Sequence, residues 1–197
     1  VTFGAGGSAN NNNTIELARR IKDEYHIEPL VHLTCLCYSK PEIDEFLAQL
    51  SDNGIENILA LRGDIVPGTE PKKDFAHASD LISFIKAEDE SFSLSGACYP
   101  ECHMEALNEV DDVLNLKRKV DAGAEHLISQ LFFDNDAFYR FKERAAIAGI
   151  NVPIEAGIMP VVNKKQIERM VSMCGASLPA KFSRMMQKYG DNPQAIR

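Results

Sequence analysis

Polar and ionisable residues follow directly after several apolar runs of this sequence. The run NILAL at residues 57–61 is followed at once by a cation, a glycine and a carboxylate, namely Arg62, Gly63 and Asp64. Similar groups follow the other apolar runs: Thr2 and Ala5, His32 and Thr34, Tyr99, Pro100, Glu101 and His103, Gln130 and Asp134, and Pro160 and Asn163. Each residue alone also fits a turn or a helix cap. Together, at the ends of parallel strands, they favour one edge that binds a charged and polar ligand.

A second candidate site lies in the stretch DDVLNLKRKVDAG. Asp112, Asn115 and Lys119 follow one another at spacings of three and four residues, so a helix places them on one face, with Arg118 beside them. Arg118 and Lys119 could hold a polyanion while Asp112 and Asn115 accept hydrogen bonds from hydroxyl groups. The alternative is an ordinary solvated helix face.

The cysteines allow a different chemistry. A thiolate and imidazole zinc site could be built from Cys35, Cys37, Cys98, Cys102, His32 and His103. Buried free thiols explain Cys35 and Cys98 equally well. The five cysteines form no CxxC pair, so reduced thiols and a cytoplasmic location are the expected state.

The elements that must position these residues follow from the apolar periodicity. Strands are predicted at Val1–Ala5, Pro29–Cys35, Asn57–Leu61, Phe92–Tyr99, His126–Phe133 and Val152–Val161. Helices are predicted at Thr14–Tyr25, Pro41–Ser51, Phe75–Ala87, Glu109–Asp121, Asn135–Ala148 and Lys164–Met173, and Asn10–Asn13 is predicted to be a polar loop. The repeated strand and helix unit leaves a doubly wound sheet or a (βα)8 barrel, and the GxGxxG pattern of nucleotide-binding doubly wound folds is missing.

Composition restricts the class of partner. The chain has 197 residues, 45% hydrophobic and 25% charged, as expected for one globular domain over residues 1–197. Its formal charge of −8 argues against broad binding to nucleic acid or to an anionic membrane, and no apolar run is long enough to span a bilayer. Small molecules or proteins are the expected partners, and the sequence is also compatible with a homo-oligomer.

Seven segments point to a known family. They are VTFGAG, HLTC, NILALRGD, HASDL, YPECH, DVLNLKRKVDAGAEHLISQLFFD and GIMPVVNKKQ, in this order along the chain. In this combination the chain resembles the methylenetetrahydrofolate reductase family. The resemblance implies a (βα)8 TIM-barrel fold that carries FAD. It also implies a ping-pong reaction of one-carbon and methionine metabolism, in which NADH or NADPH reduces FAD and the flavin then reduces 5,10-methylenetetrahydrofolate to 5-methyltetrahydrofolate.

The resemblance also assigns site residues by motif. Flavin contacts are expected from Thr2, Phe3, Ala5, His32, Arg62, Gly63, Asp64, His77, Ala78, Tyr99, His103, Ala106, Asp112, Asn115, Arg118 and Lys119. Folate contacts are expected from Asp64, Gln130 and Gln166, with Asp64 and Gln130 in catalytic roles. His77 and Phe3 each stand where the family has a tyrosine, so two hydroxyl groups are lost.

Two family segments have no counterpart in this sequence. One is a first strand whose glutamate acts as the acid, and the other is a last strand and helix that carry an arginine and a tyrosine. About six of the eight βα units are therefore expected here, in a chain that looks truncated at both ends and poorly active alone. A zinc-dependent one-carbon transferase on the same barrel and a non-catalytic fragment are the alternatives.

Overall fold

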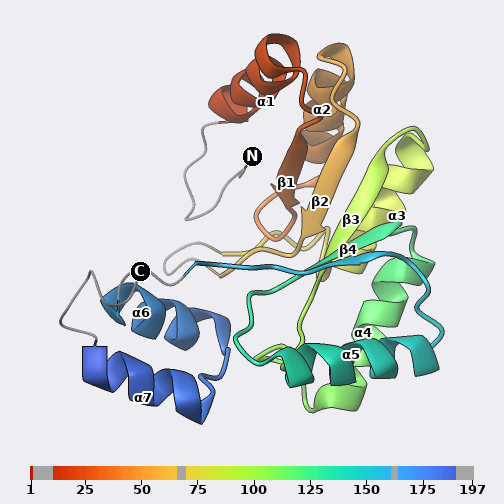
Figure 1. The fold of residues 1–197 in the computed structure, drawn as a ribbon. Helices are drawn as coiled ribbons and strands as arrows, with labels where there is room; N and C mark the ends of the chain where they lie inside the picture. Colours follow the sequence, from red (N-terminus) through yellow and green to blue (C-terminus); the bar gives the residue numbers. More distant parts are fainter. Residues whose placement is uncertain (2–10, 66–69, 161–163, 190–197) are drawn as a thin grey trace. The chain divides into compact units, whose positions relative to one another are not determined.

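A computed structural model describes residues 1, 11–65, 70–160 and 164–189, and in these ranges parallel strands alternate with helices (Figure 1). The strands are β1 (Leu30–Thr34), β2 (Asn57–Leu61), β3 (Ser93–Cys98), β4 (His126–Ser129) and β5 (Ile154–Glu155). The helices are α1 (Asn11–Tyr25), α2 (Lys40–Asp52), α3 (Ala78–Glu88), α4 (Glu109–Asp121), α5 (Asn135–Ile147), α6 (Lys164–Cys174) and α7 (Ala180–Tyr189).

The five strands form one sheet in the order β1-β2-β3-β4-β5. β1 pairs with β2 and β2 with β3 in parallel, so that Val31 lies opposite Ile58, and Ile58 opposite Leu94. A doubly wound sheet reverses its strand order at a switch point, whereas this order follows the chain throughout. The α/β fold of the barrel type is therefore confirmed.

The first predicted strand, Val1–Ala5, lies outside the described residues except for Val1. The amino group of Val1 donates to the carbonyl oxygen of Leu30 at 2.7 Å, and the N–H of His32 donates to the carbonyl oxygen of Val1 at 2.8 Å. These two bonds on either side of Val31 are the pattern of a parallel neighbour. Val1 therefore pairs with β1 on the side away from β2.

Two compact units make up the chain, and each is described by itself. The first comprises residues 1–97 and 118–127, and the second comprises residues 98–117 and 128–197. The expectation of one domain over residues 1–197 stays a prediction.

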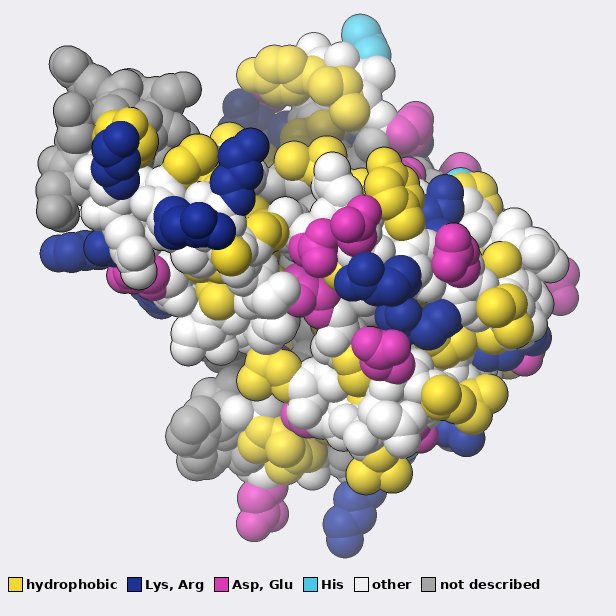
Figure 2. All heavy atoms as spheres, turned by 60° about the horizontal axis from the view of Figure 1, so that its bottom comes forward, with side chains coloured by type: hydrophobic (Ala, Val, Ile, Leu, Met, Phe, Trp, Pro, Cys, Tyr) yellow, Lys and Arg dark blue, Asp and Glu magenta, His cyan; other side chains and the backbone are white. Residues whose placement is uncertain are grey.

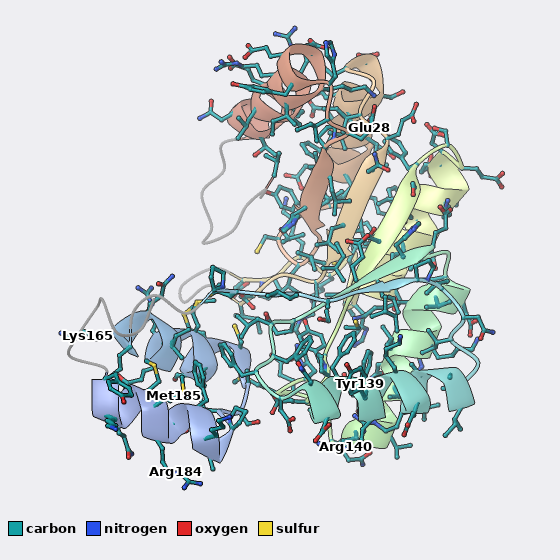
Figure 3. The ribbon with its side chains drawn as sticks, in the orientation of Figure 1. Glu28, Tyr139, Arg140, Lys165, Arg184 and Met185 are labelled. Carbon is teal, nitrogen blue, oxygen red and sulfur yellow. The ribbon has the colours of Figure 1, made fainter. Side chains whose placement is uncertain are left out.

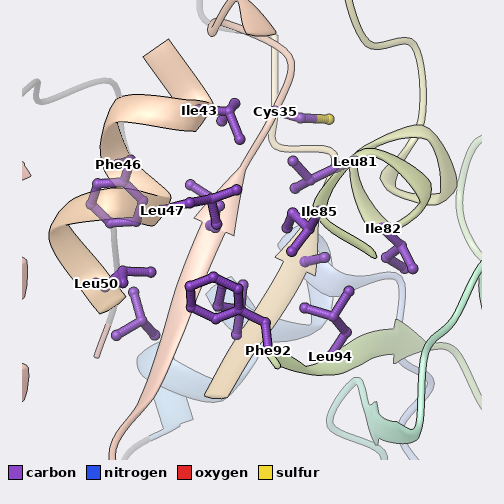
Figure 4. Packing of buried hydrophobic residues seen from close by; sticks show 14 of the residues in the cluster. Cys35, Ile43, Phe46, Leu47, Leu50, Leu81, Ile82, Ile85, Phe92 and Leu94 are labelled. Atoms are coloured by element: carbon purple, nitrogen blue, oxygen red, sulfur yellow. The ribbon is translucent and has the colours of Figure 1, made fainter. Parts of the chain in front are cut away.

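The core of the first unit lies between β1, β2 and their covering helices (Figure 4). Alternate residues of β1 are buried, as are all three central residues of β2. The helices add apolar side chains spaced three and four residues apart, which form one face of each helix. These are Ile43, Phe46, Leu47 and Leu50 of α2, and Leu81, Ile82 and Ile85 of α3.

Helix α2 begins with a capping box that extends to a neighbouring loop. The carboxylate of Glu42 accepts from the N–H and the hydroxyl of Ser39, both at 2.7 Å, and it pairs with the ammonium group of Lys72. The bond from Lys72, followed by those from Ser39, lowers the pKa of Glu42 to about 2. The carboxylate is therefore charged in the folded chain at pH values where an unfolded glutamate is protonated.

Glu42→Gln should lower the free energy of unfolding at pH 7 by no more than about 1 kcal/mol, because the pair is partly exposed. A depressed folded-state pKa gives stability that is present above the unfolded pKa and is lost as the pH falls through the folded pKa. The difference between the two proteins should therefore shrink between pH 5 and about pH 2, as measured by denaturant unfolding. Glu45→Gln, an exposed change on the same helix, is the matched control. A difference independent of pH would contradict this assignment.

The second unit contains α5, α6, α7 and residues 109–117 of α4. Asp134 caps α5 by accepting from the N–H of Asp136, and the helix buries Ala137, Phe141 and Ala145. Tyr139 and Arg140 lie on its exposed side (Figure 3). Helix α7 was not predicted from the sequence, and its Phe182 ring stacks on the ring of Phe133 at 5.5 Å.

Four predicted elements differ from the structure by more than the one or two residues usual at element ends. The strand predicted at His126–Phe133 ends at Ser129. The helix predicted at Phe75–Ala87 begins at Ala78, because Asp80 accepts from the N–H of His77 and caps the helix there.

The polar loop predicted at Asn10–Asn13 is helical from Asn11, because burial of Ile15 and Ala18 on one face of α1 outweighs the low helix propensity of asparagine. The strand predicted at Val152–Val161 covers only Ile154–Glu155. Pro153 and Pro160 flank this segment and donate no backbone hydrogen bond, which shortens it.

Charged residues of both signs are interspersed on the face shown in Figure 2, where no single basic patch forms. Among the described residues, no helix is both long and apolar enough to cross a membrane.

Candidate functional site

In the first unit, the segments after β1 and β2 are bonded to each other. The N–H of Cys35 donates to the carbonyl oxygen of Leu61 at 3.1 Å, and the N–H of Leu36 donates to that of Arg62 at 2.9 Å. Arg62 is half-buried and Asp64 is exposed. The cation and the carboxylate singled out in the sequence are therefore held at the carboxyl ends of two paired strands, where ligands bind in folds of this type.

Gly63 makes this close approach possible. Its φ of 88° lies in the region that favours glycine, and a Cβ at this position would lie 3.0 Å from the Cβ of Thr34. A side chain here would press on the end of β1. The glycine therefore lets the segment that carries Arg62 and Asp64 lie against β1.

Gly63→Ala should destabilise the first unit more than Gly54→Ala does. Gly54 also has a positive φ, 65°, but a Cβ there would meet nothing within 4 Å, so it isolates the backbone cost of about 1–2 kcal/mol. The additional loss at Gly63 measures its contact with Thr34. Denaturant unfolding of the two variants makes the comparison, and equal losses would show that Thr34 yields at no cost.

His32 lies half-buried at the middle of β1, opposite Leu59 of β2. Burial lowers its pKa below the ordinary value. The imidazole is therefore neutral at pH 7, and it can donate or accept a hydrogen bond without adding charge.

Cys35 joins the same edge to the start of α3. Its thiol donates to the carbonyl oxygens of Arg62 and His77, both at 3.7 Å, and the carboxylate of Asp80 accepts from the N–H of His77 at 2.9 Å. Burial, followed by the charge of Asp80, raises the pKa of Cys35 to about 12. Cys35 therefore serves as a thiol that holds the backbone before Ala78.

The zinc alternative gains no support from this geometry. Within the described ranges, no group of three or more histidine, cysteine or acidic residues is arranged to hold a metal ion.

The basic end of α4 reaches the end of β3. The ammonium group of Lys119 donates to the carbonyl oxygen of Ala97 at 2.8 Å, and its stem passes near Gly96. Lys119 is half-buried and Arg118 is exposed. One of the two predicted anion-binding cations therefore reaches the carboxyl end of a strand.

In the second unit, Tyr99 and His103 contact each other. Their rings meet edge to face with centroids 4.6 Å apart, and the N–H of Glu105 donates to Nδ1 of His103 at 3.1 Å. An Nδ1 that accepts places the proton of a neutral imidazole on Nε2. His103 can therefore offer an Nε2–H donor beside the tyrosine ring.

Gln130 is fixed at the end of β4. Its N–H donates to the carbonyl oxygen of Cys98 at 2.7 Å, and its side-chain oxygen accepts from the N–H of Leu131 at 2.9 Å. The hydroxyl of the preceding Ser129 is buried and accepts from the N–H of Gly157 at 2.9 Å. The amide oxygen is thus engaged, and the –NH2 end of Gln130 is the part suited to donate to a ligand.

The remaining predicted residues are less well defined. Asp112 and Asn115 are half-buried on α4, Ala106 is half-buried after β3, and Gln166 is exposed on α6. Thr2, Phe3 and Ala5 lie outside the described residues. The contacts of all these residues with a ligand stay predictions.

Comparison with known proteins decides the family. The family model described as methylenetetrahydrofolate reductase matches residues 1–197. The chain belongs to the methylenetetrahydrofolate reductase family. It is 41% identical over 194 residues to 5,10-methylenetetrahydrofolate reductase of Escherichia coli (strain K12), an alignment that covers 98% of this chain and 64% of the relative. It is 37% identical to methylenetetrahydrofolate reductase (NADH) 1 of Arabidopsis thaliana, covering 100% of this chain and 36% of the relative.

Solved structures share the fold at low identity. An uncharacterized protein from Clostridium thermocellum that binds two copies of 5-methyl-5,6,7,8-tetrahydrofolic acid matches with a TM-score of 0.57 and 16% identity, covering 90% of this chain and 62% of that one. A 2,3-dimethylmalate lyase matches with a TM-score of 0.53 and 12% identity, covering 95% and 68%. These likenesses support the barrel-type α/β fold and nothing finer.

Sequence reasoning missed two features of the second unit of this chain. One is α7, whose Phe182, Met186 and Tyr189 are spaced four and three residues apart, a signal of an amphipathic helix. The other is the bond between Glu101 and Ser177, which joins residues far apart in the chain. No local sequence pattern predicts a contact between residues so far apart.

Proposed function

We propose that this chain contributes the flavin-binding barrel to a methylenetetrahydrofolate reductase, which uses NADH or NADPH to reduce 5,10-methylenetetrahydrofolate to 5-methyltetrahydrofolate. The observation that carries the proposal is the family match over residues 1–197. The Escherichia coli relative that bears this name is 41% identical over nearly the whole chain. The chain spans 64% of that relative's length, so the activity is a proposal for the protein that contains this barrel.

The described residues fit FAD as the cofactor. A dinucleotide needs cations for its diphosphate and a backbone that can approach it closely. Lys119 is held at the end of β3, Arg62 is half-buried after β2, and Gly63 lets the backbone beside Arg62 lie against β1. FAD, when bound, would supply the hydride-transfer chemistry that no side chain provides.

Several side chains have proposed roles in holding FAD. Arg118 and Lys119 bind the diphosphate, and Asp112 and Asn115 accept from hydroxyl groups of the nucleotide. Polar and van der Waals contacts come from the remaining residues of the family motifs, namely Thr2, Phe3, Ala5, His32, Arg62, Gly63, Asp64, His77, Ala78, Tyr99, His103 and Ala106.

Asp64 and Gln130 are proposed to act on the folate. The carboxylate of Asp64 stabilises the positive charge that develops on the one-carbon unit when its ring opens. Gln130 donates from its –NH2 group to the pterin, since its side-chain oxygen is already bonded to Leu131. Gln166 adds a further polar contact.

The absorbance spectrum of the purified protein after incubation with FAD and removal of the excess tests the proposal. Retained flavin bands that bleach with NADH or NADPH and return on addition of 5,10-methylenetetrahydrofolate are the expected result. Comparison of the two nicotinamides also identifies the preferred donor. Bound zinc without flavin would instead support the transferase alternative. A protein that binds no zinc and no flavin would support a non-catalytic role.

A further inference from the structure

The loop between β3 and α4, residues 99–108, carries Tyr99, His103 and Ala106, three of the proposed flavin contacts. Within it, the N–H of Cys102 donates to the carbonyl oxygen of Tyr99 at 3.3 Å, and that of Ala106 donates to His103 at 3.0 Å. Cys102 has a φ of 83°, which a residue with a side chain rarely adopts. Such a conformation persists where surrounding contacts impose it.

Two contacts hold this loop against the turn between α6 and α7. Both carboxylate oxygens of Glu101 accept from the N–H of Ser177, at 3.1 and 3.0 Å. Beside them, Gly175 has a φ of 67°, and a Cβ on it would lie 2.8 Å from Cγ of Met104. The turn therefore approaches the loop as closely as a glycine allows.

The same turn ends the helix that carries Gln166. The N–H of Gly175 donates to the carbonyl oxygen of Val171 at 3.0 Å and closes the last turn of α6. Ile167 of α6 is fully buried, and Ala176 is buried within the turn, so helix and turn are anchored by packing. The bond from Glu101 to Ser177 therefore joins the loop that carries Tyr99 and His103 to the turn at the end of α6.

We propose that Glu101 is a positioning residue that couples the flavin-binding loop to the folate-side helix α6. The inference rests on the proposed function, which assigns Tyr99 and His103 to the flavin and Gln166 to the folate. Binding of FAD orders residues 99–108, and the bond from Glu101 to Ser177 passes this order to the turn. By thermodynamic linkage, binding of folate at α6 strengthens FAD binding by the same factor.

Hydrogen–deuterium exchange at backbone amides tests the coupling directly. In the apoprotein, the amide of Ser177 should exchange faster in Glu101→Gln than in the unaltered protein, and faster again in Glu101→Ala, because the first change removes the charge and the second removes the acceptor. Addition of FAD should slow exchange at residues 99–108 and at Ser177 in the unaltered protein. In Glu101→Ala it should slow exchange only in the loop. Glu143→Gln, an exposed change in the same unit, is the charge-matched control.

Titration with FAD supplies a second measurement. Glu101→Ala should weaken FAD binding by roughly 5- to 10-fold, which is the lower range of coupling between two sites. The FAD affinity of Glu101→Gln should lie between those of the unaltered protein and Glu101→Ala. Equal exchange at Ser177 in the apoproteins, or a response to FAD confined to residues 99–108 in the unaltered protein, would overturn the coupling alone. Failure of the unaltered protein to bind FAD would overturn the proposed function and the coupling with it.

Discussion

Lys119→Met should weaken FAD binding by about 10- to 100-fold, because a charge-assisted hydrogen bond contributes roughly 1.5–3 kcal/mol in a favourable site. The methionine keeps most of the apolar stem that passes near Gly96. It removes the ammonium group that lies at the end of β3. Arg118→Ala should weaken binding less, since Arg118 is exposed, and the double change should weaken it most. Quenching of flavin fluorescence on titration of the apoprotein gives the affinities.

Lys86→Met is a closely matched control for this experiment. Lys86 donates to the carbonyl oxygen of Phe92 at 2.8 Å, at the start of β3, as Lys119 donates to that of Ala97 at 2.8 Å near its end. Each substitution removes a cation and one bond to a backbone carbonyl of the same strand region. Lys86 also pairs with Glu125 at 2.6 Å, so its loss should cost more stability while leaving the FAD affinity unchanged. Similar affinities in the two variants would remove Lys119 from the proposed site.

The fold could be predicted well where apolar periodicity is strong. β2 was predicted at its observed bounds because four consecutive apolar residues, ILAL at 58–61, follow a turn. α4 was predicted because Val113 and Leu116 recur at helical spacing among polar residues. Prediction failed where a local signal competed with packing. The asparagines at the start of α1 were predicted to be a loop. Helix α7 follows a serine and a proline, Ser177 and Pro179, at a point where the βα pattern predicts no second helix.

The sequence predicted where the candidate residues lie in the fold, but it did not predict the hydrogen bonds that they make. That polar groups lie at strand ends follows from the position of each apolar run, so Arg62, Asp64 and Gln130 could be singled out. The bonds of Lys119 to Ala97 and of Glu101 to Ser177 span 22 and 76 residues. Such contacts depend on how the chain folds back on itself, and sequence spacing carries no signal for them.

Asp64→Asn should slow reduction of 5,10-methylenetetrahydrofolate by about 10²- to 10⁴-fold, the range typical for loss of an electrostatic or acid–base group. The carboxylate is exposed at the end of β2, in the segment that Gly63 holds against β1. Asparagine has nearly the same shape and retains one acceptor oxygen, so a turn or cap would survive the change. What it removes is the negative charge that we propose to stabilise the cationic one-carbon unit.

The two halves of the overall reaction should therefore respond differently. Oxidation of NADH or NADPH with an artificial electron acceptor involves no cationic folate, so its rate should change little in Asp64→Asn. Reduction of the folate substrate, followed in the same preparation, should fall sharply. Asp52→Asn, an exposed change at the end of α2, should leave both rates unaltered. Equal slowing of both halves by Asp64→Asn would identify Asp64 as a structural residue of the segment after β2, because disruption of that segment would impair the cofactor site as a whole.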